Sequence, residues 1–226
     1  MMELLSYQNA AEMMRALAER LASELSSVLV QNGQATLAVP GGSTPEPLFD
    51  ILSMINLDWA NITIMLTDER WVPSDSTRSN TALVKNHLLV NAARAANYVA
   101  LYEFGYNPKD GAEALSQRVA PYLPIDVLVL GMGADMHTAS LFPGAVELAS
   151  AQSAEAAAVV PIVPVGGDLE PRVTLSANAL ATAICTHVLI LGAEKKAALA
   201  RAQIYSPADA PISQFLPNAT VHWCPS

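Results

Sequence analysis

The sequence is short of positive charge. Lysine and arginine together number 12, against 21 aspartates and glutamates, so the formal net charge of the 226 residues is −9. Nucleic-acid backbones and anionic membrane surfaces are bound by clustered basic side chains, and this balance argues against both kinds of partner. If the ligand is a small anion, the few basic residues must gather at one place.

Cysteine is equally scarce, with Cys185 and Cys224 far apart and outside any C-x-x-C spacing. We therefore expect two free thiols in a reducing compartment rather than a disulfide framework.

The chain has only four histidines, and none of them shows the H-x-x-x-H spacing of metal ligands. The sequence thus predicts no dedicated metal site.

The N-terminal segment lacks the basic region and apolar block of a signal peptide. No apolar run approaches the ~20 residues that a membrane helix needs. We therefore expect a cytoplasmic protein that does not bind membranes.

Apolar residues make up 52% of the chain and charged residues 15%, and this apolar fraction is enough to bury a sizeable core. We expect one α/β domain over residues 1–226.

Near the N-terminus, apolar residues recur every three or four positions, as on one face of a helix. They are Met14, Leu17, Leu21, Leu25 and Val28. Asn32 and Gly33 follow and favour the end of that helix, because glycine readily takes a left-handed conformation. The pattern predicts a long opening helix that stops before residue 35.

Short, nearly all-apolar runs then alternate with helical patterns. The expected strands are 35–39, 62–66, 98–101, 126–130, 158–162, 172–176 and 187–191, and the expected helices are about 78–90, 110–121 and 194–204. This alternation predicts a mainly parallel, Rossmann-like sheet with helices on both faces. Residues 148–158 fit either a helix or a loop. Ligands of such sheets bind beyond the carboxyl ends of the strands, so the loops there are the candidate sites.

The first of these loops has the sequence VPGGSTPEP. Gly41 and Gly42 allow backbone amides to approach a ligand, and Ser43 or Thr44 can cap the helix that Pro45 starts. A strand, a glycine turn and a helix N-terminus together can hold a phosphate group. The alternative is a tight turn with an ordinary helix cap. The motif is neither G-x-G-x-x-G nor a P-loop, so it does not imply a nucleotide.

The second loop, TDERWVPSDSTRSN, brings Asp68, Glu69 and Arg70 together where the chain leaves a strand. An arginine there can hold a phosphate or a developing oxyanion, and Asp68 can orient a partner or move a proton. The alternative is a solvated cluster whose charges pair with one another.

The third loop, GMGADMHTASLFPG, is the densest in polar chemistry. Gly131 and Gly133 free backbone amides, and His137 carries the side chain whose ordinary pKa, roughly 6.5, suits a general base. Asp135 can orient its imidazole. A structural histidine is the alternative, but the strand-end position beside an acid favours a functional one. No G-x-S-x-G motif supports a serine hydrolase, and Ser140 is interpreted as a helix residue.

Read together, the segments VPGGSTP, TDERWVP, DSTRSN, GMGADMHTASLFPG and EPRVTLSANAL resemble the bacterial 6-phosphogluconolactonases of the pentose phosphate pathway. The order and spacing match from about residue 35 to 200. The wider group includes glucosamine-6-phosphate deaminases and, more distantly, ribose-5-phosphate isomerases. The resemblance implies a phosphosugar isomerase/lactonase fold, a phosphosugar lactone as the small-molecule substrate, and no cofactor.

The resemblance also implies a mechanism, in which water hydrolyses the lactone to 6-phosphogluconate without a metal. His137 would be the base that activates water, with Asp135 beside it. Asp68 and Arg70 would line the same site. One position departs from the family, because the common D-G-H is here Asp135-Met136-His137. Methionine makes a positive φ or a close ligand approach more costly than glycine does.

The resemblance implies a separate set of ligands for the 6-phosphate of the substrate. They are Gly41, Gly42, Ser43, Thr44, Arg172 and Lys196. Lys195 is the alternative to Lys196, because the sequence does not say which side chain points inward. Arg70, Arg172 and one lysine would then form a positive pocket within an acidic protein.

Two other functions stay open at this point. An amino-sugar-phosphate isomerase or deaminase needs a carboxylate to move a proton between C1 and C2, and Asp68 could serve. The deaminases carry an acid in an NEP segment shortly after the histidine, where this chain has LFP at 141–143, which favours the lactonase. The other alternative is a sugar-phosphate sensor that binds its ligand without turnover.

Overall fold

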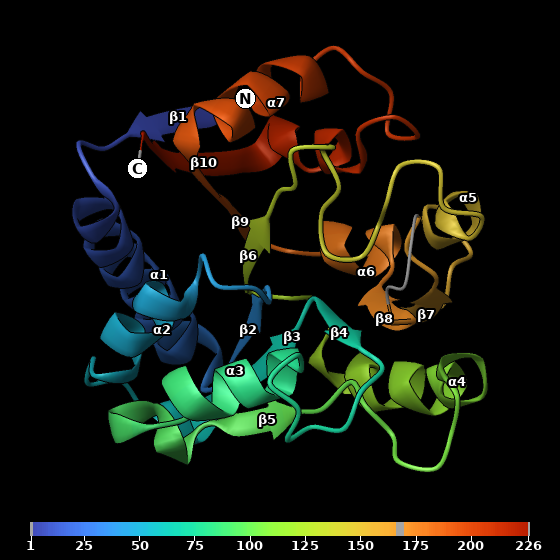
Figure 1. Cartoon of the computed structure of the whole chain (residues 1–226). Coiled ribbons are helices and arrows are strands. Elements are labelled where there is room, and N and C mark those ends of the chain that lie inside the picture. The colour runs from blue at the N-terminus through green and yellow to red at the C-terminus, as the bar shows by residue number, and fades with distance from the viewer. Residues whose placement is uncertain (1, 166–169, 226) are drawn as a thin grey trace.

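A computed structural model of the chain describes residues 2–165 and 170–225. Its centre is a seven-stranded sheet in which every pair of neighbours runs parallel (Figure 1). From one edge to the other, the strands are β1 (Glu3–Ser6), β10 (Ala219–Cys224), β9 (Cys185–Leu191), β6 (Val127–Gly131), β2 (Ala35–Val39), β3 (Ile62–Leu66) and β5 (Asn97–Val99). The expected α/β class with a mainly parallel sheet is confirmed.

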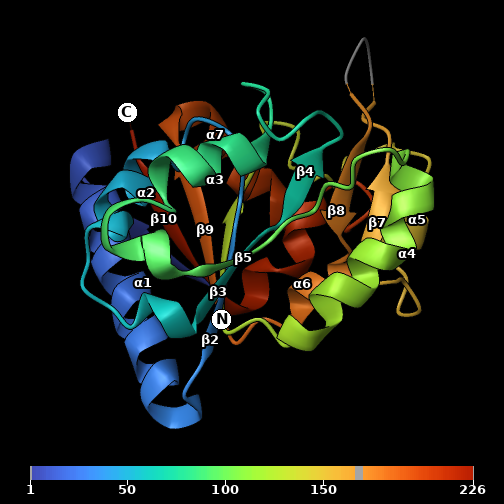
Figure 2. The same ribbon diagram turned by 90° about the horizontal axis from the view of Figure 1, so that it is seen from below.

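Helices cover both faces of this sheet. They are α1 (Ala10–Asn32), α2 (Glu46–Ser53), α3 (Asn80–His87), α4 (Pro108–Val119), α5 (Leu148–Ala151), α6 (Ala177–Ala181) and α7 (Gly192–Ala202). Figure 2 shows α1 and α2 on one side of the central sheet, whereas α4 lies toward the other side and packs mainly against the strand Val159–Ile162. The three helices expected after residue 78 correspond to α3, α4 and α7. None of the helices within the described residues has the length and apolar character needed to cross a bilayer.

The opening helix follows its apolar stripe. The helix α1 packs against β2, β6 and β10. The side chains of its stripe are each at most 2% exposed: Met14, Leu17, Leu21 and Leu25. Burial of each such side chain contributes about 1.5–3 kcal/mol. The helix ends as expected at Gly33, which takes φ 74° and donates its N–H to the carbonyl oxygen of Leu29.

Two of the expected strands do not belong to the central sheet. The strands β7 (Val159–Ile162) and β8 (Arg172–Leu175) join β4 (Asp68–Arg70) in a small antiparallel sheet of order β4-β8-β7. Short apolar runs do not reveal whether their partner is parallel or antiparallel, so the sequence predicted one sheet where there are two. The strands β1, β4 and β10 were not predicted. Of the open segment 148–158, only α5 is helical.

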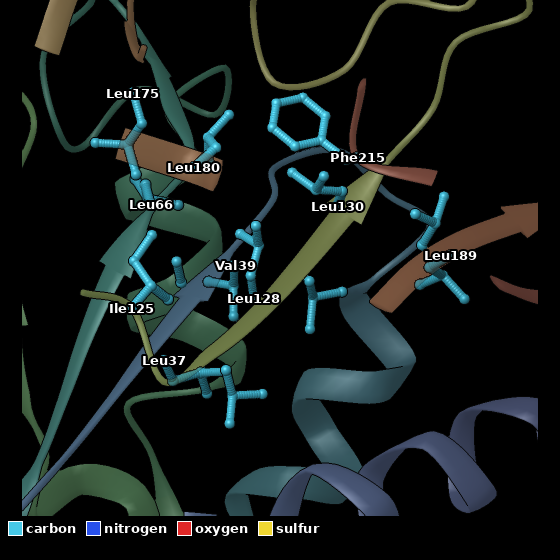
Figure 3. Packing of buried hydrophobic residues seen from close by; sticks show 14 of the residues in the cluster. Leu37, Val39, Leu66, Ile125, Leu128, Leu130, Leu175, Leu180, Leu189 and Phe215 are labelled. Atoms are coloured by element: carbon cyan, nitrogen blue, oxygen red, sulfur yellow. The ribbon is translucent and has the colours of Figure 1, made fainter. Parts of the chain in front are cut away.

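The core fixes the strand ends that carry the candidate loops. Figure 3 shows Leu37 and Val39 of β2 beside Leu128 and Leu130 of β6, and all four side chains are fully buried. The chain runs from β2 to β3 on one side, whereas β6 lies on the other side of β2. The carboxyl ends of β2 and β6 therefore flank a switch in strand order, where sheets of this kind bind ligands.

A chain of buried and partly buried polar side chains joins α1 to strands β9 and β10. The Nε2 atom of His187 lies 2.8 Å from Oε2 of Glu24, and its Nδ1 lies 3.1 Å from Nε2 of His222. The Nδ1 atom of His222 lies 2.9 Å from the hydroxyl of Tyr7. Burial, followed by the nearby His187, lowers the pKa of His222 from its ordinary 6.5 to about 3.

This depressed pKa predicts a loss of stability in mild acid. Below pH 6.5 the unfolded chain protonates His222 and the folded chain does not, so the stabilisation present above pH 6.5 is lost progressively toward pH 3. We expect the free energy of unfolding to be about 2 kcal/mol lower at pH 5 than at pH 7. Urea unfolding of the wild type and His222→Gln at both pH values measures it. Equal losses in the two proteins would show that His222 is not the group responsible.

Candidate active site

A cavity of about 510 Å³ opens at the carboxyl ends of β2 and β6. Residues 40–45 form one wall and residues 131–137 another. The small sheet adds Asp68 and Arg70 from β4 and Arg172 from β8. The three loops that the sequence singled out thus meet around one space.

His137 and Asp135 form a close pair at this cavity. The Nδ1 atom of the imidazole lies 2.5 Å from Oδ1 of Asp135, which also accepts the backbone N–H of His137 at 3.2 Å. Burial raises the pKa of Asp135, but the hydrogen bond and charge of His137 outweigh it, and the net shift is downward. An ionised Asp135 keeps the proton of the imidazole on Nδ1. Within the described residues, Nε2 of His137 has no hydrogen-bond partner and is available as a base.

A tight turn brings the two side chains together. Gly133 accepts the N–H of Met136 and donates its own N–H to the carbonyl oxygen of His137, both at 3.0 Å. Met136 takes φ 68°, the left-handed conformation that favours glycine. Such a backbone costs about 1–3 kcal/mol. Its side chain is only 7% exposed, and burial of a methionine contributes a similar amount, so the turn tolerates the departure from glycine.

Asp68 lines the cavity and is 5% exposed. Its carboxylate accepts the hydroxyl of Ser140 at 2.6 Å and that of Thr67 at 3.2 Å, and it lies 3.7 Å from a guanidinium nitrogen of Arg172. Ser140 is in a turn, so its interpretation as a helix residue was wrong. With these partners, the carboxylate is suited to hold Arg172 in place.

Arg70 and Arg172 are directly opposite each other on the neighbouring strands β4 and β8 of the small sheet. The Nε atoms of both are buried and lack a hydrogen-bond partner among the described residues. Burial lowers the pKa of Arg172; the charge of Asp68 opposes this shift and that of Arg70 adds to it. Two neighbouring cations with unused donors make a favourable place for an anionic group.

The glycine loop after β2 differs from expectation in its helix cap. Pro45 is the N-cap of α2 and no side chain caps the helix, so neither Ser43 nor Thr44 has the predicted role. Both residues line the cavity instead, and Gly42 takes φ 88°. A Cβ atom at Gly41 would overlap the side chain of Asn80, which explains why a glycine is needed there. Among the described residues, the hydroxyls of Ser43 and Thr44 have no hydrogen-bond partner, so both can donate to a ligand.

The two lysines of α7 have separate surroundings. Lys195 lines the cavity, whereas Nζ of Lys196 lies 3.5 Å from the ring centroid of Trp223. The choice of Lys196 as the inward-facing lysine is thereby corrected to Lys195. At 3.6 residues per turn, adjacent side chains point about 100° apart, so only one of them can face the cavity. Burial lowers the pKa of Lys195, while Glu194 and Asp135 oppose the shift.

Some residues that build the site were not foreseen in these roles. Glu69 is fully buried and accepts the backbone N–H groups of Arg70, Asn80 and Thr81 and the hydroxyl of Ser79, which ties β4 to the start of α3. The side-chain amide of Asn80 donates to the carbonyl oxygen of Asp68 at 2.9 Å. In the sequence, the one sign of these roles is that Ser79 and Asn80 end the same polar loop that begins with Asp68 and Glu69. Among the described residues, no group of three His, Cys, Asp or Glu side chains could hold a metal ion.

The chain is similar to a set of known proteins over almost its whole length. It is 37% identical to a 6-phosphogluconolactonase of Rhizobium meliloti, with 97% of both chains covered. It is 39% identical to one of Pseudomonas aeruginosa, with 96% of this chain and 92% of the relative covered. The crystal structure of a 6-phosphogluconolactonase from Shewanella baltica superposes with a TM-score of 0.95 at 33% identity, covering 99% of this chain and 98% of that one.

The family described as glucosamine-6-phosphate isomerases/6-phosphogluconolactonase matches residues 8–223. That range begins before α1 and ends within β10, so it includes all the strand-end loops that line the cavity. The resemblance noted on the loop sequences therefore extends to the whole fold. This chain belongs to the family of glucosamine-6-phosphate isomerases and 6-phosphogluconolactonases.

Proposed function

We propose that the protein hydrolyses 6-phospho-D-glucono-1,5-lactone to 6-phospho-D-gluconate, as the names of its relatives suggest. The observation that carries this proposal is the His137–Asp135 pair. Among the described residues, Nε2 of His137 has no hydrogen-bond partner, and His137 lines a cavity that Arg172 and Lys195 also line. A base and a cluster of cations in one cavity suit a substrate with a reactive ester and an anionic phosphate.

His137 acts as a general base in this proposal. Its Nε2 takes a proton from water, and the hydroxide oxygen attacks C1 of the lactone. Arg70, or the amides of residues 131–138, stabilises the oxyanion of the tetrahedral intermediate. The C1–O bond of the ring then breaks, and the ring oxygen leaves with a proton from His137 or from solvent. A general base contributes about 10²–10⁴-fold, which suffices because the lactone is already an activated ester.

The phosphate of the substrate is held away from the reacting carbon. Arg172 and Lys195 supply charge, and Ser43, Thr44 and the amide of Gly42 supply hydrogen-bond donors from the loop after β2. Asp68 holds Arg172 in position through its carboxylate.

An amino-sugar-phosphate isomerase or deaminase is the second candidate within the family. It needs a carboxylate free to move a proton, whereas the carboxylate of Asp68 is engaged by Ser140, Thr67 and Arg172. The segment LFP at 141–143 also replaces the acidic segment of the deaminases. These two features favour the lactonase.

A direct assay separates the candidates. Fresh 6-phosphogluconolactone is followed with and without protein, and we expect hydrolysis well above the spontaneous rate. Glucosamine 6-phosphate is tested in parallel for released ammonia, and we expect none. Binding of 6-phosphogluconate without turnover of the lactone would instead indicate a sensor.

We also propose that this reaction serves the oxidative pentose phosphate pathway in the cytoplasm. The names of the relatives support this pathway, because hydrolysis of 6-phosphogluconolactone is one of its steps. Fractionation of cells that express the protein tests the location, and recovery outside the cytoplasmic fraction would contradict it.

The two lysines of α7 provide a matched pair of variants. Lys195→Met removes a charge that would bind the phosphate, and a hydrogen bond to a charged group contributes about 1.5–3 kcal/mol. We expect kcat/KM to fall roughly 10–100-fold, mainly through KM. Lys196→Met removes the contact with Trp223, which lies outside the cavity lining, and kcat/KM stays near the wild-type value. Steady-state kinetics with the lactone decide, and the reverse order would return the phosphate role to Lys196.

A further inference from the structure

The aromatic ring of Phe142 contacts both His137 and Arg172 at the cavity. The ring centroid of Phe142 lies 4.7 Å from that of His137, at an interplanar angle of 47°. The guanidinium carbon of Arg172 lies 5.2 Å from the same phenyl centroid. Phe142 lines the cavity and is 8% exposed. The candidate base and the candidate phosphate ligand thus share one neighbour.

The backbone around Phe142 is fixed to the strand that precedes it. Thr138 and Leu141 form an antiparallel bridge, and the hydroxyl of Thr138 donates to the carbonyl oxygen of Gly131 at 2.8 Å. Leu141 is fully buried, and the carbonyl oxygen of Phe142 accepts the N–H of Ala145. The phenyl ring is therefore anchored to the end of β6.

The two neighbours of the ring differ in how firmly they are otherwise held. Arg172 has Asp68 at 3.7 Å and the hydroxyl of Ser140 at 3.5 Å. Among the described residues, the side chain of His137 has one hydrogen bond, from Nδ1 to Asp135, and the ring can still turn about that bond. Contact with the phenyl ring restricts this rotation on one side of the imidazole. A tilted aromatic pair of this kind adds to the stability of one orientation.

We propose that Phe142 is a positioning residue, which sets the orientation of His137 and its separation from Arg172. The inference rests on the proposed function. A substrate whose phosphate is held at Arg172 then presents C1 to Nε2 of His137. Because small displacements at a reacting centre lower rates steeply, loss of the ring reduces kcat as well as affinity.

The test compares Phe142→Leu, Phe142→Met and Phe142→Tyr with the wild type, after the folded fraction is measured by thermal unfolding. Leucine and methionine keep apolar volume without the ring, and tyrosine keeps the ring. We expect Phe142→Leu and Phe142→Met to lower kcat about 10–100-fold and to raise KM several-fold. We expect Phe142→Tyr to retain most of both. If one of the ringless variants fails to fold, the other provides the measurement.

A double variant distinguishes positioning from a general packing role. In a His137→Gln background, Phe142→Leu should lower kcat by less than threefold, because the group that it orients is already gone. Equal losses in both backgrounds, or folded ringless variants with wild-type kcat and KM, would overturn the proposal. The wild-type assay tests the lactonase function separately from the role of Phe142, because absence of turnover in the wild type refutes only the lactonase function. In that event the affinity for 6-phosphogluconate tests the ring, and unchanged affinity in Phe142→Leu refutes its role.

Discussion

His137→Gln is expected to lower kcat for lactone hydrolysis by about 10²–10⁴-fold, with little change in KM. Glutamine has a similar reach and can still donate a hydrogen bond to Asp135, but it does not accept a proton from water. The loss therefore falls on the chemical step and not on binding. Rates must be measured above the spontaneous hydrolysis of the lactone, at several protein concentrations.

A second histidine supplies the control for this experiment. His87 lies on α3, with its Nδ1 2.8 Å from a carboxylate oxygen of Asp50, and it does not line the cavity. His87→Gln repeats the same chemical change at a distance from the site and should leave kcat unaltered. If His137→Gln keeps kcat within threefold of the wild type, His137 is not the base.

Gly133→Ala is expected to damage the site without removing any functional group. A Cβ atom at this position would overlap Oδ1 of Asp135 and Nδ1 of His137, which are the two atoms that form the pair. The side chains must separate to make room. Because a displacement of about 1 Å at a catalytic group can cost about 10²-fold in rate, we expect a loss of that order in kcat. Overpacking of this kind also lowers stability by about 1–3 kcal/mol.

The neighbouring glycine of the same loop provides the comparison. A Cβ atom at Gly131 would meet only Cβ of Pro40, at an ordinary contact distance of 4.0 Å. Gly131→Ala should therefore lose much less activity than Gly133→Ala. Kinetics and urea unfolding of both variants test the difference. Comparable losses would show that the close approach at Gly133 does not govern the pair.

Much of the fold could be predicted from local patterns. The stripe of α1 and its glycine stop, and the apolar runs that became β2 and β3, have the expected positions. The error concerned β7 and β8, whose apolar runs resemble those of the central sheet but pair with β4. Strand partners lie far apart in the chain, and spacing within one segment carries no information about them.

In the candidate site too, some features follow from local spacing and others depend on the tertiary structure. The sequence indicated that Asp135 can orient the imidazole of His137, although a spacing of two residues does not by itself ensure contact. The two side chains do form a hydrogen bond. The orientation of Lys195 was not predictable, since it depends on the rotation of α7 against Trp223 of β10. The caps expected from Ser43 or Thr44 were wrong, because Pro45 is the N-cap of α2 and both residues line the cavity.

By itself, the amino-acid sequence determined the elements, the loops rich in glycine and polar residues, and the Asp135–His137 pair. These features depend on residues a few positions apart, whose spacing sets helix, strand and turn geometry directly. The tertiary structure alone decided that Arg70 lies opposite Arg172 and that Phe142 lies between Arg172 and His137. The first contact arises from the antiparallel pairing of β4 with β8, and the second from contacts of that sheet with the segment that follows β6. These partners are far apart in the sequence, so no local pattern encodes them.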